Sequence, residues 1–216
     1  MKFRAVIFDL DGTLLDTLQD IADSVNLVLE RAGLPRYSLD EYRYFIGDGV
    51  EHLARRVLPQ WQRDDVSVAQ VAAAIREEYR QRWSNKTRPY HGIPDLLDFL
   101  TTHGIRMAVL SNKPDDFTRL TVSRLLPQWR FDAVVGAQPN GPYKPDPRAA
   151  LEIADRLGIP PREFVYLGDS GIDMETASAA GMYPVGALWG FRTREELVAS
   201  GAKETIESPV DLTRLL

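Results

Sequence analysis

The sequence has no cysteine among its 216 residues, which excludes disulfide bonds, thiolate metal sites and a cysteine nucleophile. It also lacks a basic excess, because its formal net charge is −5. A nucleic-acid-binding surface would normally carry such an excess, so no nucleic-acid partner is expected. An anionic substrate would then need positive charge supplied locally.

Long hydrophobic runs are missing as well. The opening apolar segment, residues 5–8, is too short for the apolar region of a signal peptide or for a membrane span. No later apolar run is long enough to span a membrane. We therefore expect a cytoplasmic protein with no membrane partner. No heptad or symmetric pattern is present, and a monomer or weak homodimer is the default expectation.

Two common kinds of ligand site are also absent. No Gly-x-x-x-x-Gly-Lys-Ser/Thr loop occurs, which argues against a nucleotide-driven motor or kinase. The three histidines are spread along the chain without ligand spacing, so a zinc site is not expected. What is present is an ordinary globular composition, with 44% hydrophobic and 26% charged residues.

Short apolar runs alternate with amphipathic segments over most of the chain. The runs, which predict buried strands, cover residues 5–8, 106–110, 133–135, 164–167 and 184–188. Helical patterns cover residues 94–102, 115–126, 147–157 and 172–180. This alternation predicts an α/β fold with a doubly wound, Rossmann-like parallel sheet.

One segment interrupts the alternation, because residues 16–84 show helical periodicity and no convincing strand. It predicts an inserted α-helical cap domain of about four helices, leaving residues 1–15 and 85–216 as the α/β catalytic core. Ser38 and Glu41 have the spacing of a capping box at the start of one cap helix. The turn-rich residues 89–94 mark the return to the core.

The first polar cluster follows the strand at residues 5–8. Asp9 and Asp11 lie two apart, so on an extended chain both carboxylates project to the same side, although the turn at Gly12 can re-aim the second. The carboxyl end of a parallel sheet is where ligands bind, and paired acids there favour metal binding and acid–base work. The alternative is an ordinary strand end that turns at Asp and Gly.

Two further clusters suit a phosphate. Ser111 and Asn112 follow another strand and precede a helix start, and a helix N-terminus with a hydroxyl donor binds phosphate well. Lys144, just before a third helix start, is the leading candidate for neutralising phosphate charge. Taken singly, Ser111 is equally an N-cap and Lys144 a solvated surface lysine.

The fourth cluster brings more acids to a strand end. Asp169 is a candidate ligand for Mg²⁺, which takes a few oxygen ligands together with water and substrate phosphate. Asp173 has an alternative explanation as an acid in the first turn of a helix. All four clusters end or follow different predicted strands at one sheet edge, which favours a shared site over separate turns and caps.

In this order, and with a helical insertion after the first, the four clusters resemble the haloacid dehalogenase superfamily, in particular its phosphoglycolate-phosphatase-like members. Residues 179–182 and 188–192 also look typical of that subgroup. The resemblance implies a Mg²⁺-dependent phosphatase acting on a small phosphorylated metabolite, with phosphoglycolate as the leading substrate.

The resemblance also implies a role for each matching residue. Asp9 is the nucleophile that becomes phosphorylated, and Asp11 is the general acid for the leaving alkoxide and then the base for water. Mg²⁺ is held by Asp9, the backbone carbonyl of Asp11 and Asp169. The supporting roles are phosphate contacts from Thr13, Ser111 and Asn112, charge compensation by Lys144, orientation of Lys144 or of metal-bound water by Asp173, and close backbone approach at Gly12.

Other functions on the same pattern remain open at this point. A phosphomutase or pyrophosphatase would use the same fold. A haloacid dehalogenase proper would use the nucleophile without a metal, and a non-enzymatic phospho-receiver would be shorter and lack the helical insertion. Substrate selection is expected from the cap, with the candidates residues 46–49, Arg43, His52, Arg55 and Arg56.

Overall fold

The computed structural model describes residues 3–138 and 141–216. The chain divides into two compact units, one formed by Met1–Leu15 with Pro89–Leu216 and the other by Asp16–Arg88. The second boundary lies four residues beyond the one expected from the sequence. The reason is that the backbone N–H groups of Lys86 and Thr87 donate to a carboxylate oxygen of Asp20, at 2.9 and 2.8 Å, which holds this stretch on the helical unit.

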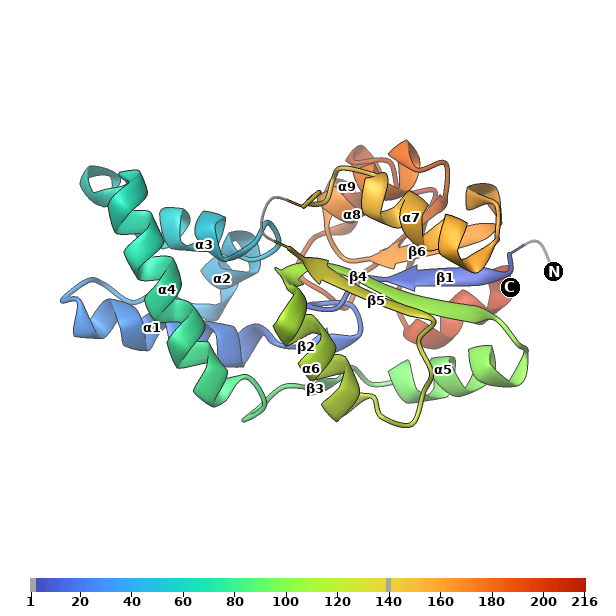
Figure 1. The fold of residues 1–216 in the computed structure, drawn as a ribbon, viewed down its shortest axis with the longest axis horizontal. Helices are drawn as coiled ribbons and strands as arrows, with labels where there is room; N and C mark the ends of the chain where they lie inside the picture. The colour runs from blue at the N-terminus through green and yellow to red at the C-terminus, as the bar shows by residue number, and fades with distance from the viewer. Residues whose placement is uncertain (1–2, 139–140) are drawn as a thin grey trace. The chain divides into compact units, whose positions relative to one another are not determined.

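The larger unit contains a parallel sheet in the strand order β5-β4-β1-β6-β7-β8 (Figure 1). Its strands are β1 (Ala5–Phe8), β4 (Arg106–Pro114), β5 (Ala133–Ala137), β6 (Phe164–Gly168), β7 (Tyr183–Ala187) and β8 (Glu204–Ile206). The predicted doubly wound α/β class is confirmed. Strand order reverses at β1, between β4 and β6, and in such sheets ligands bind outside the carboxyl ends of the strands at this point.

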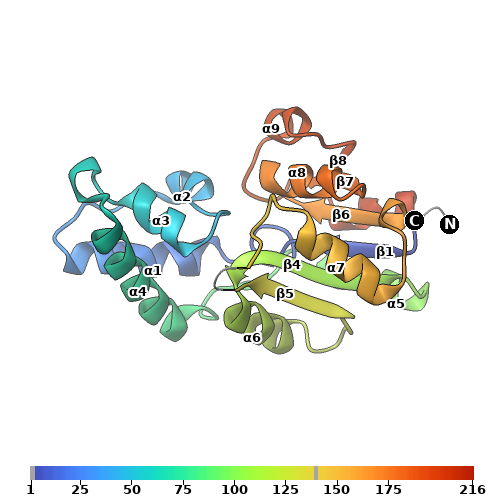
Figure 2. The same ribbon diagram turned by 45° about the horizontal axis from the view of Figure 1, so that its top comes forward.

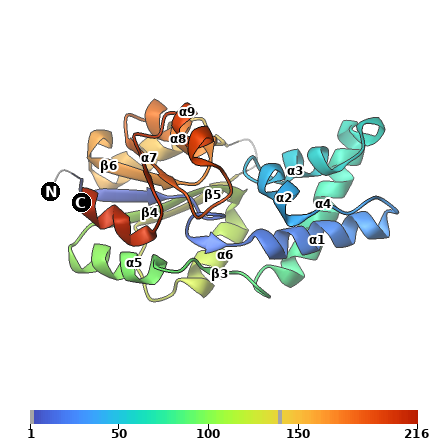
Figure 3. The same cartoon turned by 180° about the vertical axis from the view of Figure 1, so that it is seen from behind.

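Helices cover both faces of this sheet, and successive side chains of β1 point to opposite faces. Val6 and Phe8 belong to the apolar cluster with α5 (Ile93–Thr102), whereas Ile7 belongs to the cluster with α7 (Arg148–Leu157). The other helices and helical turns of this unit are α6 (Asp115–Leu125), η2 (Pro161–Glu163), α8 (Gly171–Ala179), α9 (Arg194–Ala199) and η3 (Pro209–Leu215). Figure 3 shows η3 beside α5.

The smaller unit is helical, and in it α1 packs against α4 (Figure 2). Its elements are α1 (Leu18–Arg31), α2 (Leu39–Phe45), α3 (Val50–Val57), η1 (Gln60–Gln62) and α4 (Asp65–Arg82). Short strands β2 (Leu15–Asp16) and β3 (Arg88–Pro89) pair where the chain enters and leaves it. The expected capping box is present at α2, where Ser38 N–H donates to Glu41 at 2.8 Å. Among the described residues, no helix combines the length and apolar character of a membrane span.

A two-point ion pair joins the first residue of β4 to the loop before β5. Nε and Nη2 of Arg106 donate to the two carboxylate oxygens of Asp132 at 2.7 and 2.6 Å. The guanidinium holds the pKa of Asp132 below its ordinary value of 3.8. A carboxylate with a depressed folded-state pKa stabilises the protein above its unfolded-state pKa, and this stability is lost as pH falls through the folded-state pKa.

We expect Asp132→Asn to lower the free energy of unfolding by about 1 kcal/mol at pH 7, a value discounted because Arg106 is half-exposed. The deficit should stay constant down to about pH 5 and shrink at more acidic pH, as the wild-type carboxylate is protonated. Urea unfolding across this range measures it, with the exposed Asp116→Asn as control. A deficit that grows towards acid would contradict the assignment.

Candidate active site

Three acidic side chains meet at the carboxyl end of the sheet. Asp9 follows β1 directly, and its backbone N–H donates to the carbonyl of Leu167 in β6 at 2.9 Å. Asp169 follows β6 directly, and Asp173 lies in the first turn of α8. One carboxylate oxygen from each of the three acids lies within 4.8 Å of the others, and all three residues are buried. The structure therefore brings together acids from two neighbouring strands and one helix.

Lys144 enters the same cluster from the loop before α7. Its Nζ lies 2.8 Å from Oδ1 of Asp9 and 2.7 Å from Oδ1 of Asp173. Asn112 holds the backbone at this point, since its Nδ2 donates to the carbonyl of Lys144 at 3.1 Å and its Oδ1 accepts from the Lys144 N–H at 2.8 Å. Lys144 is thus a fixed buried charge, and the solvated-lysine interpretation does not apply.

Burial and mutual repulsion dominate the electrostatics of the cluster. Burial, followed by repulsion from Asp173, raises the pKa of Asp9 despite the opposing ammonium of Lys144. Burial and the charge of Asp173 likewise raise the pKa of Asp169 to about 7. Burial alone would lower the pKa of Lys144, but the charges of Asp173 and Asp9 outweigh it, and that pKa lies well above its ordinary value.

The charge balance and donor set fit a hard divalent cation. Three carboxylates face one ammonium, so the ionised cluster carries a net negative charge that a divalent ion would offset. Mg²⁺ prefers oxygen ligands of this kind and keeps places for water and phosphate. Asp9 and Asp169 would hold it, as expected from the sequence, and Asp173 adds a third carboxylate within reach.

The surrounding chain fixes Asp169 in place. Its Oδ1 accepts from the Thr13 hydroxyl at 2.9 Å, and its Oδ2 accepts from the Phe191 N–H at 2.8 Å. Gly12, with φ of +88°, lies directly against it, because a Cβ there would fall 2.7 Å from the Asp169 Cγ. A Cβ at Gly190 would likewise collide with Asp169. Glycine is therefore required at Gly12 both for backbone conformation and for space.

Asp11 is engaged by a residue that the sequence analysis did not single out. Nζ of Lys113 donates to both carboxylate oxygens of Asp11, at 2.9 and 3.0 Å. The Asp11 side chain is 13% exposed and that of Lys113 is 5% exposed. The general acid expected at Asp11 thus has a buried cationic partner from the end of β4.

The three side chains expected to contact phosphate have different hydrogen-bond partners in the structure. The side chain of Thr13 is fully buried and donates to Asp169, so it orients a carboxylate. Asn112 uses both ends of its carboxamide on the Lys144 backbone. Ser111 Oγ accepts from the Lys113 N–H at 3.2 Å, and a hydroxyl that accepts still has its hydrogen to donate. Of the three side chains, Ser111 best matches the expected phosphate contact.

Asp173 contacts Lys144, as expected, and also makes contacts with Ser170 that were not foreseen. Its Oδ2 accepts from the Ser170 hydroxyl at 2.6 Å and from the Ser170 N–H at 3.1 Å, while its Oδ1 accepts from Lys144. The helix-start interpretation and the expected supporting role are therefore compatible, because one oxygen accepts from Ser170 at the start of α8 and the other accepts from Lys144. The serine three residues before Asp173 was the available sequence signal.

The cap arginines proposed for substrate selection have partners within the helical unit. Arg55 donates to the Arg63 carbonyl and pairs with Asp65. Arg56 donates to the Phe45 carbonyl and pairs with Asp48. Arg43 pairs with Asp40, and His52 is exposed. The two arginines of α3 therefore have contacts within the helical unit itself, and their part in selection stays a prediction.

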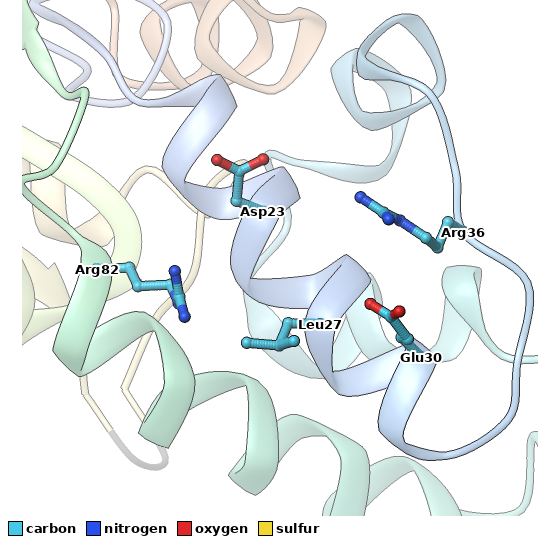
Figure 4. Close-up of a pocket in the computed structure, with 5 residues that line it drawn as sticks. All are labelled: Asp23, Leu27, Glu30, Arg36 and Arg82. Carbon is cyan, nitrogen blue, oxygen red and sulfur yellow. The ribbon is translucent and has the colours of Figure 1, made fainter.

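A polar pocket of about 180 Å³ lies in the helical unit (Figure 4). Its lining residues are Asp23, Leu27, Glu30, Arg36 and Arg82. Two of its charges are already neutralised, because Asp23 pairs with Lys86 at 2.7 Å and Arg82 pairs with Glu78. This lining lacks the buried acids that the cluster at the end of the sheet contains.

Comparison with known proteins gives one consistent result. The family model described as haloacid dehalogenase-like hydrolase matches residues 6–187. A phosphoglycolate phosphatase of Aquifex aeolicus is 32% identical over 99% of this chain and 96% of its own length. One of Pseudomonas putida is 33% identical over 99% of this chain and 78% of its own length. A crystal structure from Lactobacillus delbrueckii subsp. bulgaricus has 30% identity and a TM-score of 0.93, covering 100% of this chain and 98% of that one.

Proposed function

The chain belongs to the haloacid dehalogenase-like hydrolases, and from this premise we propose that it is a Mg²⁺-dependent cytoplasmic phosphatase with Asp9 as its nucleophile. Its proposed substrate is a small phosphomonoester, with phosphoglycolate the leading candidate because similar enzymes carry that name. The observation that carries the proposal is the contact of buried Asp9 with Lys144, beside Asp169 and Asp173.

In the proposed reaction, a carboxylate oxygen of Asp9 attacks phosphorus and the ester oxygen leaves. Asp11 gives its proton to that oxygen, and it then removes a proton from the water that attacks the aspartyl phosphate. Lys144 offsets charge at the phosphoryl oxygens, and its ammonium opposes the rise in the pKa of Asp9. Bound Mg²⁺ would reduce the repulsion between Asp9 and the anionic substrate.

A panel of phosphorylated metabolites tests the proposed substrate. It should include phosphoglycolate, sugar phosphates, nucleoside monophosphates and pyrophosphate, each assayed with Mg²⁺ for released phosphate. We expect the highest kcat/KM for phosphoglycolate. A sugar phosphate isomerised without phosphate release would instead identify a mutase, and hydrolysis of none of the panel would remove the phosphatase proposal.

Metal binding has a separate expected effect on stability. We expect Mg²⁺ to raise Tm, since an ion present at a hundredfold excess over its Kd stabilises the folded state by about 2.7 kcal/mol. Asp169→Asn should abolish the rise because it removes a charged ligand from the cluster. Thermal unfolding with Mg²⁺ and with chelator measures both, and the exposed Asp116→Asn is the matched control. Equal Tm values for the wild type under the two conditions would contradict the site.

A further inference from the structure

Lys113 is a buried lysine whose side-chain ammonium contacts the proposed general acid. Its Nζ lies 2.9 and 3.0 Å from the two oxygens of Asp11. We propose that Lys113 is a positioning residue that holds the Asp11 carboxylate in place for both of its proton transfers. This inference rests on the proposed phosphatase function and adds a residue to it.

The burial of Lys113 is the first reason to assign it a role. Lysine is almost never fully buried unless it is paired, because removing an ammonium from water is costly. Here the Lys113 side chain is 5% exposed, and it forms an ion pair with Asp11, 102 positions away in the sequence. The pairing links the loop after β1 to the end of β4, and both belong to the same compact unit.

The position of Lys113 on β4 is the second reason. Ser111 and Lys113 lie two apart near the end of the strand, where the pairing of β4 with β5 shifts register, and the Asn112 side chain between them contacts the Lys144 backbone. The Lys113 N–H also donates to the Ser111 hydroxyl oxygen. One short strand end thus serves a proposed phosphate contact, the Lys144 loop and the general acid.

The two-point contact with Lys113 fixes the orientation of the Asp11 carboxylate. Asp11 precedes a turn that begins at Gly12 with a positive φ, and Asp11 is itself part of an isolated bridge to Leu15. Two near-equal hydrogen bonds from one ammonium fix the rotation of the carboxylate, which a single bond would leave open. Fixed oxygens keep the proton donor at one distance from the leaving atom.

The proton balance assigns Lys113 no transfer of its own. When the phosphorus–oxygen bond of the ester breaks and the bond to Asp9 forms, the Asp11 proton passes to the leaving oxygen. When water attacks the aspartyl phosphate, its proton returns to Asp11. Lys113 itself transfers no proton, and it can donate to Asp11 before and after each transfer, because a protonated carboxyl group retains acceptor capacity.

Leaving-group dependence separates positioning from a structural role. p-Nitrophenolate leaves without protonation, whereas an alkoxide needs the acid, and kcat/KM reports only the steps up to transfer of the phosphoryl group to Asp9. We expect Lys113→Met to lower kcat/KM about 10²-fold for the best alkyl phosphate of the panel. For p-nitrophenyl phosphate we expect kcat/KM to fall by less than about tenfold. Lys113→Arg should recover most of the loss, because a guanidinium also binds a carboxylate at two points.

Three further variants complete the design. Lys203→Met, at an exposed lysine of the same unit, should leave both substrates unaffected. In an Asp11→Asn background, Lys113→Met should cost little more, because the two residues act as one unit. Lys113→Gln serves the same comparison if the methionine variant does not fold.

The outcomes distinguish this inference from the proposed function. Equal losses on the two esters would show that Lys113 binds phosphate or only supports the fold, and would overturn the assignment, as would unchanged rates on both. Additive losses in the Asp11→Asn background would overturn it too. A wild-type protein that hydrolyses neither ester would overturn the phosphatase function and this inference with it.

Discussion

Asp9→Asn is expected to lower kcat by about 10⁴-fold or more, because it removes the oxygen nucleophile that must form the covalent bond to phosphorus. Asparagine has nearly the same shape and still accepts the Leu10 N–H bond that Asp9 accepts at 2.7 Å. The substitution also removes one of three buried carboxylates, and burial and repulsion already raise the pKa of that group. The fold should therefore persist while turnover is lost.

The measurement combines steady-state turnover with trapping of the phosphorylated protein. Wild-type protein quenched in acid during turnover should carry phosphate on the peptide that contains Asp9, and the asparagine variant should carry none. Circular dichroism and thermal unfolding verify that the variant is folded, and Asp116→Asn provides a control for the loss of an exposed aspartate. Turnover by Asp9→Asn within tenfold of wild type would exclude the nucleophile assignment.

The core strands were predictable because they form short runs of apolar or β-branched residues. Residues 5–8 were expected as a strand and β1 has those bounds. The strand β8 was not expected, since Glu204–Ile206 is short and half polar and offers no apolar run. It pairs parallel with β7 at the edge of the sheet, a tertiary contact that three residues of local pattern do not signal.

The acids of the candidate site were predictable for a different reason. Asp9 and Asp169 each follow an apolar strand, and parallel strands deliver their ends to one edge. The hydrogen-bond partners of the polar side chains were not predictable in the same way. Thr13 and Asn112 were expected on phosphate, yet their side chains contact Asp169 and the Lys144 backbone.

Lys113 shows the limit of sequence reasoning most clearly. Its neighbours Ser111 and Asn112 drew attention because hydroxyl and amide groups suit phosphate, whereas a lysine is by default solvated. Its partner, Asp11, lies 102 residues away. Only folding of β4 beside β1 brings the two together, so the pair had no local signature.

Lys144→Met is expected to have the second-largest effect, and it acts on stability and activity together. The variant leaves Asp9 and Asp173 buried without their shared ammonium. Removing one partner of a buried ion pair costs about 3–5 kcal/mol, because the remaining charge is uncompensated. Loss of the ammonium beside the phosphoryl oxygens should lower kcat by about 10³-fold. Urea unfolding and steady-state kinetics measure the two effects.

A double variant separates the two effects of Lys144. Lys144→Met with Asp173→Asn removes one positive and one negative charge, and an asparagine oxygen can still accept from the Ser170 N–H, as Asp173 does at 3.1 Å. Most of the lost stability should return, since replacing both members of a buried pair is often close to neutral. Activity should stay low, because no cation then faces the phosphoryl group. Recovery of turnover in parallel with stability would mean that Lys144 only balances the charge of Asp9 and Asp173.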